Sequence, residues 1–393
     1  MSYALPALIA IGLVRHVKKP SGNPFARLAR GATRGRTLRI LERIQPSSGG
    51  FLEATPLTSF VTMSLAGAGL SEHPVARKAA AFLEKSARPD GAWAIDTNLA
   101  TWVTTLSVNA LGDALPAEAK APIRSWLLGQ QTKGVHPYTG AAPGAWAWTD
   151  LPGGVPDADD TPGALLALAR LREGPDPELV AAARSGCRWL VDLQNRDGGI
   201  PTFCRGWGKL PFDRSCPDLT AHALRAWSAW MAEVPGLSPA VARAERYLVE
   251  SQQADGSWIP LWFGNQRAPL QENPVYGTAR VLLHPDRGGD WAVSRRRGVG
   301  WLRDAQNPDG GWGGAPGIPS SIEETALAVE ALAPEGDVER GVRWLVERTA
   351  GGMRFEPAPI GLYFAKLWYS EKLYPLIFTV SALGRVLSEW RSA

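Results

Sequence analysis

The chain has 393 residues, of which 45% are hydrophobic and 20% are charged, a composition that excludes wholesale disorder. The net charge of +4 is small for this length and gives no indication of nucleic-acid binding. Three cysteines are too few for a disulfide framework and indicate a reducing compartment. Tryptophan is in surplus: its 17 residues equal the 10 Phe and 7 Tyr combined, so these rings must fill cores or line a site.

The first predicted element is an apolar helix over residues 3–14, followed by a basic stretch. It is too short to span a bilayer and contains Pro6. No positive charge precedes it and no small-residue cleavage site follows it, which argues against a signal peptide. A buried helix is the first interpretation, and a helix resting on a membrane surface is the alternative. We expect a cytoplasmic protein that is soluble or bound peripherally to a membrane.

A short motif then recurs every 40 to 60 residues or so. The pattern Q-x-x-D-G-x-W begins at Gln252 and at Gln306, and the segment QNRDGGI at Gln194 repeats it with Ile in the aromatic place. RPDGAW, from Arg88, lacks the Gln, and QPSSGGF, from Gln45, is a more decayed copy. Each copy follows one amphipathic segment and precedes a second apolar run, which is typical of an array of helix pairs.

The motif has a physical interpretation. A Gln at a helix end can hydrogen-bond the loop backbone, and Asp-Gly forms the tight turn. The Trp then stacks on the neighbouring repeat, and we assign this role to Trp93, Trp258 and Trp312. No alternating β-branched run stands out, so strands should be scarce.

We predict an all-α fold: an α/α toroid of six inner and six outer helices over residues 70–393, with an N-terminal helical extension over residues 1–69, all in one domain. The inner helices are predicted to begin near Leu99, Thr161, Pro217, Pro274, Ser320 and Tyr374.

An acidic motif opens the second inner helix. Asp157, Asp159 and Asp160 place three carboxylates within four residues. One interpretation is a capping loop, with Thr161 as the N-cap and Pro162 at the first helical position. Crowded like charges raise each other's pKa, however, and a carboxyl kept protonated near neutral pH is what a general acid requires. From the spacing alone, the capping interpretation and the general-acid interpretation are equally supported.

The sequence predicts no metal site and no cofactor. Gly163 occupies the place of the last acid of a magnesium-binding D-D-x-x-D motif. The cysteines and the five histidines lack paired zinc-ligand spacing, and no G-x-S-x-G or phosphate-binding Gly loop occurs. Mg²⁺ enters only if the substrate carries a diphosphate.

The repeats and the D-A-D-D motif together resemble the squalene–hopene cyclase family of class II terpene cyclases, over nearly the whole chain. The resemblance implies that the motif protonates a terminal alkene or epoxide and starts a carbocationic cyclisation. It makes Asp159 the proton donor, flanked by Asp157 and Asp160. His222, in the T-A-H segment, would orient the proton, and Tyr276, in the Y-G-T segment, would help the acid to regain it.

The resemblance also implies an aromatic pocket. Trp102, Trp148, Trp262 and Tyr363 fall at or near cation-stabilising positions of the family. A hydrocarbon cation in a dry pocket has no counter-ion, and each aromatic face supplies about 0.5–2 kcal/mol by cation–π attraction. Core packing is the alternative for any single Trp, but the inner-helix or loop positions of Trp102, Trp148 and Trp262 favour the pocket, whereas His222 alone would suggest a buried structural role.

The family has two toroids, and this chain is too short for both. One toroid makes squalene a doubtful substrate, so we expect a farnesyl- or geranylgeranyl-type chain on a small head group, with squalene or another triterpene precursor as the alternative. Residues 266–272 form an extra loop that would reshape the entrance, and residues 3–14 or 359–367 are candidates for peripheral membrane contact. The expected partner is a hydrophobic polyprenyl molecule, and no oligomeric state is indicated.

Two other classes remain open at this point. Trp-rich α/α toroids also hydrolyse glycosides, where rings stack on sugars and two carboxylates flank the bond. A non-catalytic helical-repeat protein that binds lipid, with the acids only as a cap, is the third interpretation.

Overall fold

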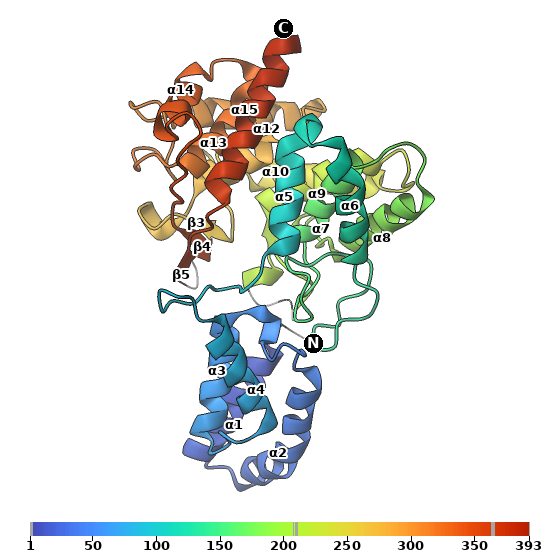
Figure 1. Cartoon of the computed structure of the whole chain (residues 1–393), viewed down its shortest axis with the longest axis vertical. Helices are drawn as coiled ribbons and strands as arrows, with labels where there is room; N and C mark the ends of the chain where they lie inside the picture. The colour runs from blue at the N-terminus through green and yellow to red at the C-terminus, as the bar shows by residue number, and fades with distance from the viewer. Residues whose placement is uncertain (1–2, 207, 209–210, 363–365, 393) are drawn as a thin grey trace.

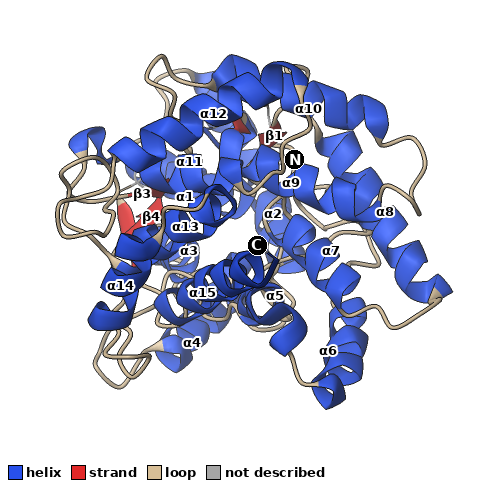
Figure 2. Cartoon of the chain, turned by 90° about the horizontal axis from the view of Figure 1, so that it is seen from above, coloured by secondary structure: helices blue, strands red, loops and turns tan. Residues whose placement is uncertain are grey.

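The structure, a computed structural model, describes residues 3–206, 208, 211–362 and 366–392. Six of its helices form an inner ring: α5 (Ala100–Leu111), α7 (Asp160–Arg170), α9 (Pro217–Trp230), α11 (Pro274–Leu282), α13 (Ile322–Leu332) and α15 (Tyr374–Ser392). Each packs on the next, and α15 packs on α5 and closes the ring (Figure 2). The predicted all-α toroid and its six inner helices are confirmed.

A second layer surrounds the ring. Its helices are α6 (Ala117–Gly129), α8 (Pro177–Leu193), α10 (Ser238–Ser251), α12 (Gly289–Asp304) and α14 (Glu339–Arg348). They lie at the periphery in Figure 2, and each packs on an inner helix. Their inward sides are apolar, as in α8, where Leu179, Ala183 and Leu190 are fully buried.

The N-terminal residues form a separate helical bundle below the ring (Figure 1). It contains α1 (Leu5–Lys18), α2 (Pro24–Ile44), α3 (Thr55–Gly67) and α4 (Pro74–Ser86). The sequence analysis counted the segment from residue 74 as an outer helix of the toroid, but α4 packs on α3 instead. Val75 and Ala76 of α4 share a core with Leu65 of α3. We therefore propose that the toroid begins near residue 99.

Strands are few and short, as predicted, in the part of the chain that the structure describes. β1 (Ile200–Pro201) pairs antiparallel with β2 (Ser215–Cys216), and β3 (Phe263–Gly264), β4 (Ile360–Leu362) and β5 (Leu367–Tyr369) form a second antiparallel sheet. Short 3₁₀ helices cover Phe51–Glu53, Gly112–Ala114, Pro211–Asp213, Pro269–Gln271 and Ala333–Glu335. No helix of the described residues is both long and apolar enough to cross a bilayer.

The repeat glutamines bond the loop as predicted and also reach the next outer helix. Gln252 Nε2 donates to Gly256 O and to Ser294 O of α12, both at 2.8 Å. Gln194 and the decayed Gln45 make the same pair of bonds. So does Gln131, which donates to Gly144 O and to Ala182 O. The sequence analysis missed this copy, because an insertion separates Gln131 from the rest of its motif.

The repeat tryptophans clamp neighbouring helices together. Trp258 is fully buried, donates to Leu248 O at 2.8 Å, and packs so tightly on α12 that a Cβ on Gly298 would lie 2.5 Å from its ring. Trp312 packs in the same way on Gly341 of α14. Trp93 makes the equivalent bond to Leu83 O, yet it is 52% exposed. Its predicted packing role was wrong, because α4 belongs to the bundle.

Candidate active site

The acidic motif lies where α7 begins, on the side of the ring that faces the bundle (Figure 1). Asp157 Oδ1 accepts the backbone N–H groups of Asp159 and Asp160, both at 2.8 Å. Asp157 is thus the capping carboxylate. The capping role proposed for Thr161 was wrong, because its hydroxyl accepts the backbone N–H of Trp146 at 3.1 Å. Capping therefore explains Asp157 but not Asp159 or Asp160.

The three acids differ in burial. Asp157 and Asp160 are 2% and 4% exposed, whereas the Asp159 side chain is 21% exposed. Burial, with the nearby charge of Asp159, raises the pKa of Asp157 to about 7 despite its hydrogen bonds. Burial and the charges of Asp157 and Asp159 raise the pKa of Asp160 well above its usual value. Asp157 and Asp160 therefore retain protons near neutral pH, and Asp159 is the acid of the motif that reaches accessible space.

His222 lies directly against Asp159. Its Nδ1 is 3.0 Å from Asp159 Oδ1, and the side chain is 5% exposed. Burial outweighs the carboxylate and lowers the pKa of His222 to about 4, and the charge of Arg280 acts in the same direction. The imidazole is therefore neutral at neutral pH. A neutral His hydrogen-bonded to a carboxyl can orient the carboxyl without taking its proton permanently.

Tyr276 is buried in α11, and Asn273 Oδ1 accepts its backbone N–H at 3.0 Å. Burial, with the charges of Asp159 and Asp218, raises the pKa of Tyr276 well above its usual value. Its hydroxyl therefore stays protonated. The charge of Asp159 acts on Tyr276, but the structure shows no hydrogen bond between the described atoms of the two side chains, and the part of Tyr276 in returning a proton to the acid stays a prediction.

Of the predicted tryptophans, Trp102 lies in α5, and Trp148 and Trp262 lie in the segments that precede α7 and α11. Trp102 Nε1 donates to the Tyr374 hydroxyl at 2.7 Å, which joins the first and last inner helices. Its backbone N–H donates to Trp148 O at 3.1 Å. Trp148 Nε1 is buried without a hydrogen-bond partner. Tyr363, the fourth predicted pocket residue, lies outside the described residues.

Trp262 belongs to a larger cluster, here called the aromatic wall: Tyr3, Trp148, Phe203, Phe212, Trp262, Phe263 and Tyr276. Phe203 is its centre, with ring centroids 4.7 Å from Trp262, 5.0 Å from Phe212 and 5.6 Å from Tyr3. Phe263 lies 4.8 Å from Tyr276 and so links the wall to the acid. Through these ring contacts the wall runs from Tyr3, before the first helix of the bundle, to Tyr276 of α11.

Sequence reasoning missed several residues of this region. Asp218, one helical turn before His222, accepts the Cys216 thiol at 2.7 Å, and burial raises its pKa to about 6. That i to i+4 spacing was a usable signal. Asp96, whose charge helps to raise the pKa of Asp160, gave no signal because it follows a decayed repeat. Tyr3 and Phe203 gave none because they lie on separate segments that meet only in the fold.

The titration of Asp157 predicts a pH dependence of stability. The folded protein holds this proton up to about pH 7, whereas the unfolded chain releases it near pH 4. Because the folded state binds more protons in this window, the free energy of unfolding should fall as pH rises from 4 to 7, by about 1.4 kcal/mol per unit. Asp157→Asn keeps a capping oxygen and removes the titration. Urea unfolding of both proteins across this range should show a flatter profile for the variant, and parallel profiles would contradict the assignment.

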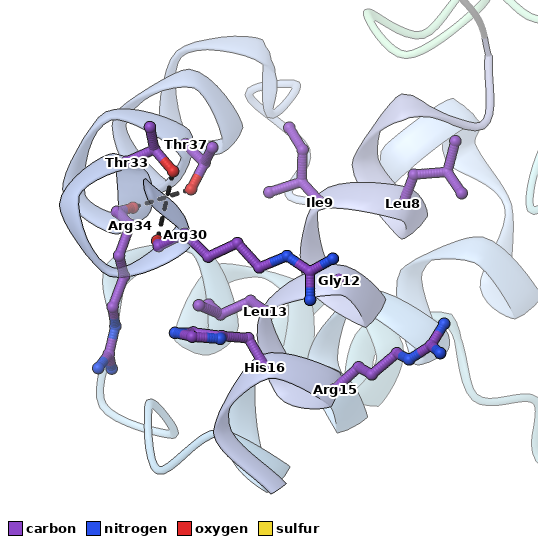
Figure 3. Close-up of a pocket in the computed structure, with 10 residues that line it drawn as sticks. All are labelled: Leu8, Ile9, Gly12, Leu13, Arg15, His16, Arg30, Thr33, Arg34 and Thr37. Carbon is purple, nitrogen blue, oxygen red and sulfur yellow. Dashed lines mark hydrogen bonds between the residues drawn. The ribbon is translucent and has the colours of Figure 1, made fainter. Parts of the chain in front are cut away.

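A cluster of metal ligands and a cavity are two other features that could mark a functional site. Among the described residues, no group of three or more His, Cys, Asp or Glu side chains is arranged to hold a metal ion. A cavity of about 310 Å³ lies in the N-terminal bundle between α1 and α2 (Figure 3). It is remote in sequence from the acidic motif and is considered separately below.

The closed α/α ring, with a buried acidic motif facing aromatic rings, is the arrangement of the terpene-cyclase class of toroids. The chain belongs to the squalene-hopene cyclase family: the squalene-hopene cyclase C-terminal domain matches residues 99–388. This match begins where the toroid begins, at α5, and excludes the bundle.

Individual relatives agree with this assignment. Drimenyl diphosphate synthase of Streptomyces showdoensis is 34% identical over 238 residues, which cover 58% of this chain and 40% of that protein. Squalene–hopene cyclase of Bradyrhizobium diazoefficiens is 29% identical over 328 residues, covering 72% and 48%. The chain thus spans less than half the length of these two relatives.

Solved structures show the same fold. ent-Copalyl diphosphate synthase from Streptomyces platensis superposes with a TM-score of 0.58 at 18% identity, covering 97% of this chain and 75% of that one. A type II terpene cyclase from Scytonema, solved with geranylgeranyl dihydroxybenzoate, gives 0.55 at 16% identity, covering 74% and 88%.

Proposed function

We propose that the protein is an enzyme, a class II terpene cyclase in which Asp159 protonates the terminal alkene or epoxide of a linear polyprenyl chain. The observation that carries the proposal is the Asp159–His222 pair. It places the one accessible acid of a proton-retaining cluster against a neutral imidazole, beside the aromatic wall. The family of the chain supports the same reaction class.

The chemistry follows from these residues. In the tautomer that carries the proton on Nδ1, His222 donates to Asp159 Oδ1 and leaves the proton of the carboxyl on Oδ2, free to face the substrate. Transfer of that proton to the CH carbon of the terminal alkene uses the π electrons to form a C–H bond and leaves a tertiary cation on the dimethyl-substituted carbon. Internal alkenes then attack in turn. Loss of a proton or addition of water ends the sequence, and solvent, through Tyr276, returns a proton to Asp159.

The aromatic wall supports a hydrocarbon substrate better than a sugar. Phe203 and Trp262 contact edge to face at 78° and the other pairs are mostly tilted, so the wall is a packed apolar aromatic cluster. A glycosidase would require polar groups beside the rings and a second carboxylate across the bond. We therefore set aside the glycosidase and scaffold interpretations.

We propose a farnesyl- or geranylgeranyl-type substrate. One toroid offers less enclosed space than two, and relatives named drimenyl and copalyl diphosphate synthases support chains of this length. The Scytonema neighbour, solved with a geranylgeranyl dihydroxybenzoate, supports a small aromatic head group as an option. Proton transfer from Asp159 needs no cofactor, and Mg²⁺ dependence is expected only for diphosphate substrates. Peripheral membrane contact remains part of this proposal.

The reaction class has a direct test. Incubation in D₂O with farnesyl diphosphate, geranylgeranyl diphosphate, geranylgeranyl dihydroxybenzoate and squalene should give cyclised product from a shorter chain, with one deuterium on the ring methylene carbon next to the geminal dimethyl carbon of the first ring. Mass spectrometry and NMR read both results. Cyclic product without deuterium, or no cyclic product from any of the four, would overturn the proposal.

The aromatic wall predicts a second outcome. Phe203→Ala removes the ring that contacts Tyr3, Phe212 and Trp262, whereas Phe203→Tyr keeps its face. Loss of about 0.5–2 kcal/mol of cation stabilisation lowers turnover by roughly 2- to 30-fold. We expect Phe203→Ala also to release partly cyclised alcohols, as water reaches the cation early. Identical product profiles for both variants would remove Phe203 from the pocket.

A further inference from the structure

The N-terminal bundle contains a cavity that the proposed cyclisation does not use. It lies between the helices α1 and α2 of the bundle and has a volume of about 310 Å³ (Figure 3). One part of its lining is apolar, from Leu8, Ile9 and Leu13 of α1. The other part is cationic, from Arg15 of α1 and from Arg30 and Arg34 of α2.

These positive charges are not neutralised within the fold. Among the described residues, the guanidinium groups of Arg15, Arg30 and Arg34 make no ion pair and no hydrogen bond, in contrast to Arg172 and Arg295, each of which pairs with a Glu. Three uncompensated guanidiniums around one cavity create a positive potential that attracts an anion. The helix α2 contains six Arg residues and one Glu and so strengthens this potential.

Arg30 and His16 are the charged or polar lining side chains that reach across between the two helices (Figure 3). Arg30 extends from α2 across to Gly12 of α1, and the ring of His16 points back toward α2 (Figure 3). His16 Nδ1 is buried without a hydrogen-bond partner, a state that costs free energy unless a ligand satisfies it. A guanidinium fork matches phosphate oxygens in two parallel hydrogen bonds, and His16 can add a further donor.

The apolar side of the cavity indicates what the anion must carry. Ile9 is half-buried, Leu13 is 7% exposed and Leu8 is 45% exposed, so apolar surface runs from the cavity floor to its rim. An inorganic anion would leave this surface wet. We propose that the α1–α2 cavity is a second binding site, for a phosphate or diphosphate ester that carries an apolar chain. The phosphate lies against Arg30, Arg34 and His16, and the start of the chain lies on Leu8 and Leu13.

Comparing the affinities of dodecyl phosphate, inorganic phosphate and dodecanol separates the contribution of the phosphate charge from that of the apolar chain. Calorimetric titration of the full-length protein should give dodecyl phosphate a Kd at least tenfold below those of the other two. Arg30→Gln/Arg34→Gln should weaken its binding at least tenfold. Arg36→Gln/Arg39→Gln is the matched control, because it removes the same charge from α2 outside the cavity, and it should bind like the wild type. Leu8→Ser should weaken dodecyl phosphate and leave inorganic phosphate unchanged.

Sedimentation with lipid vesicles distinguishes two sources of such a ligand, a membrane lipid and a free phosphorylated chain. If phosphatidylcholine vesicles containing phosphatidic acid capture the wild type but not Arg30→Gln/Arg34→Gln, a membrane lipid supplies the phosphate. If vesicles capture neither while soluble dodecyl phosphate binds, the ligand is a free phosphorylated chain such as a prenyl diphosphate. An equal loss of dodecyl phosphate binding in Arg30→Gln/Arg34→Gln and in Arg36→Gln/Arg39→Gln, or no loss in either variant, would overturn the proposed cavity site. Binding is measured without turnover, so Asp159→Asn should leave it unchanged, and failure of the cyclase proposal would not affect it.

Discussion

Asp159→Asn should abolish cyclisation while the protein remains folded. The amide has nearly the shape of the carboxyl but has no acidic proton to transfer, so the first C–H bond cannot form. General acid catalysis of this kind contributes about 10²–10⁴-fold, and we expect turnover to fall by at least the upper part of that range. Steady-state assay by mass spectrometry, with thermal unfolding measured in parallel, checks both parts.

The fold should tolerate this change because the Asp159 side chain is 21% exposed and does not cap α7. The free energy of unfolding should change by less than about 1 kcal/mol. Asp150→Asn, in the exposed loop before the motif, is the matched control and should keep full activity. Undiminished cyclisation by Asp159→Asn would remove Asp159 from the role of proton donor.

Trp258→Ala should produce the largest loss of stability. The side chain is fully buried between α10 and α12, and its ring nearly touches Gly298, so truncation leaves a cavity that the helices cannot close. Such Trp→Ala changes cost about 3–5 kcal/mol. Chemical denaturation followed by circular dichroism measures the difference.

Trp93→Ala supplies the control for this prediction within the same chain. Trp93 has the same place in its repeat and the same kind of bond to a carbonyl ten residues earlier, but it is 52% exposed. Its removal should cost less than about 1 kcal/mol. Similar losses for the two variants would show that the indole hydrogen bond, rather than packing on the next helix, stabilises the repeat.

Local motifs were predictable where their residues are close in sequence. The Gln and Asp-Gly positions of the repeats required particular turns, and the D-A-D-D spacing located the acid at the start of α7. The pairing of His222 with Asp159 joins residues 63 positions apart and came from the family resemblance, since a lone buried His has no distinctive pattern.

Long-range packing was not predictable in the same way. α4 has the apolar pattern of an outer helix, and only its contact with α3 shows that it belongs to the bundle. The aromatic wall combines Tyr3 with residues more than 190 positions away, and no local pattern encodes such a meeting. Thr161 was a good N-cap candidate by residue type, but the helix begins one residue earlier, at Asp160, and the Thr161 hydroxyl accepts the N–H of Trp146.

The ring closes only when the last inner helix, α15, packs on the first, α5. The indole N–H of Trp102 donates to the hydroxyl of Tyr374, which lies 272 residues later in the sequence. This hydrogen bond of the first inner helix can therefore form only when the last inner helix is present. An open solenoid can gain stability one repeat at a time, whereas a closed circle gains its final interface in one late step. During synthesis, Asp159 would therefore be present on the chain before the ring closes. We expect the closed ring, and with it any cyclisation, to appear only when α15 packs on α5.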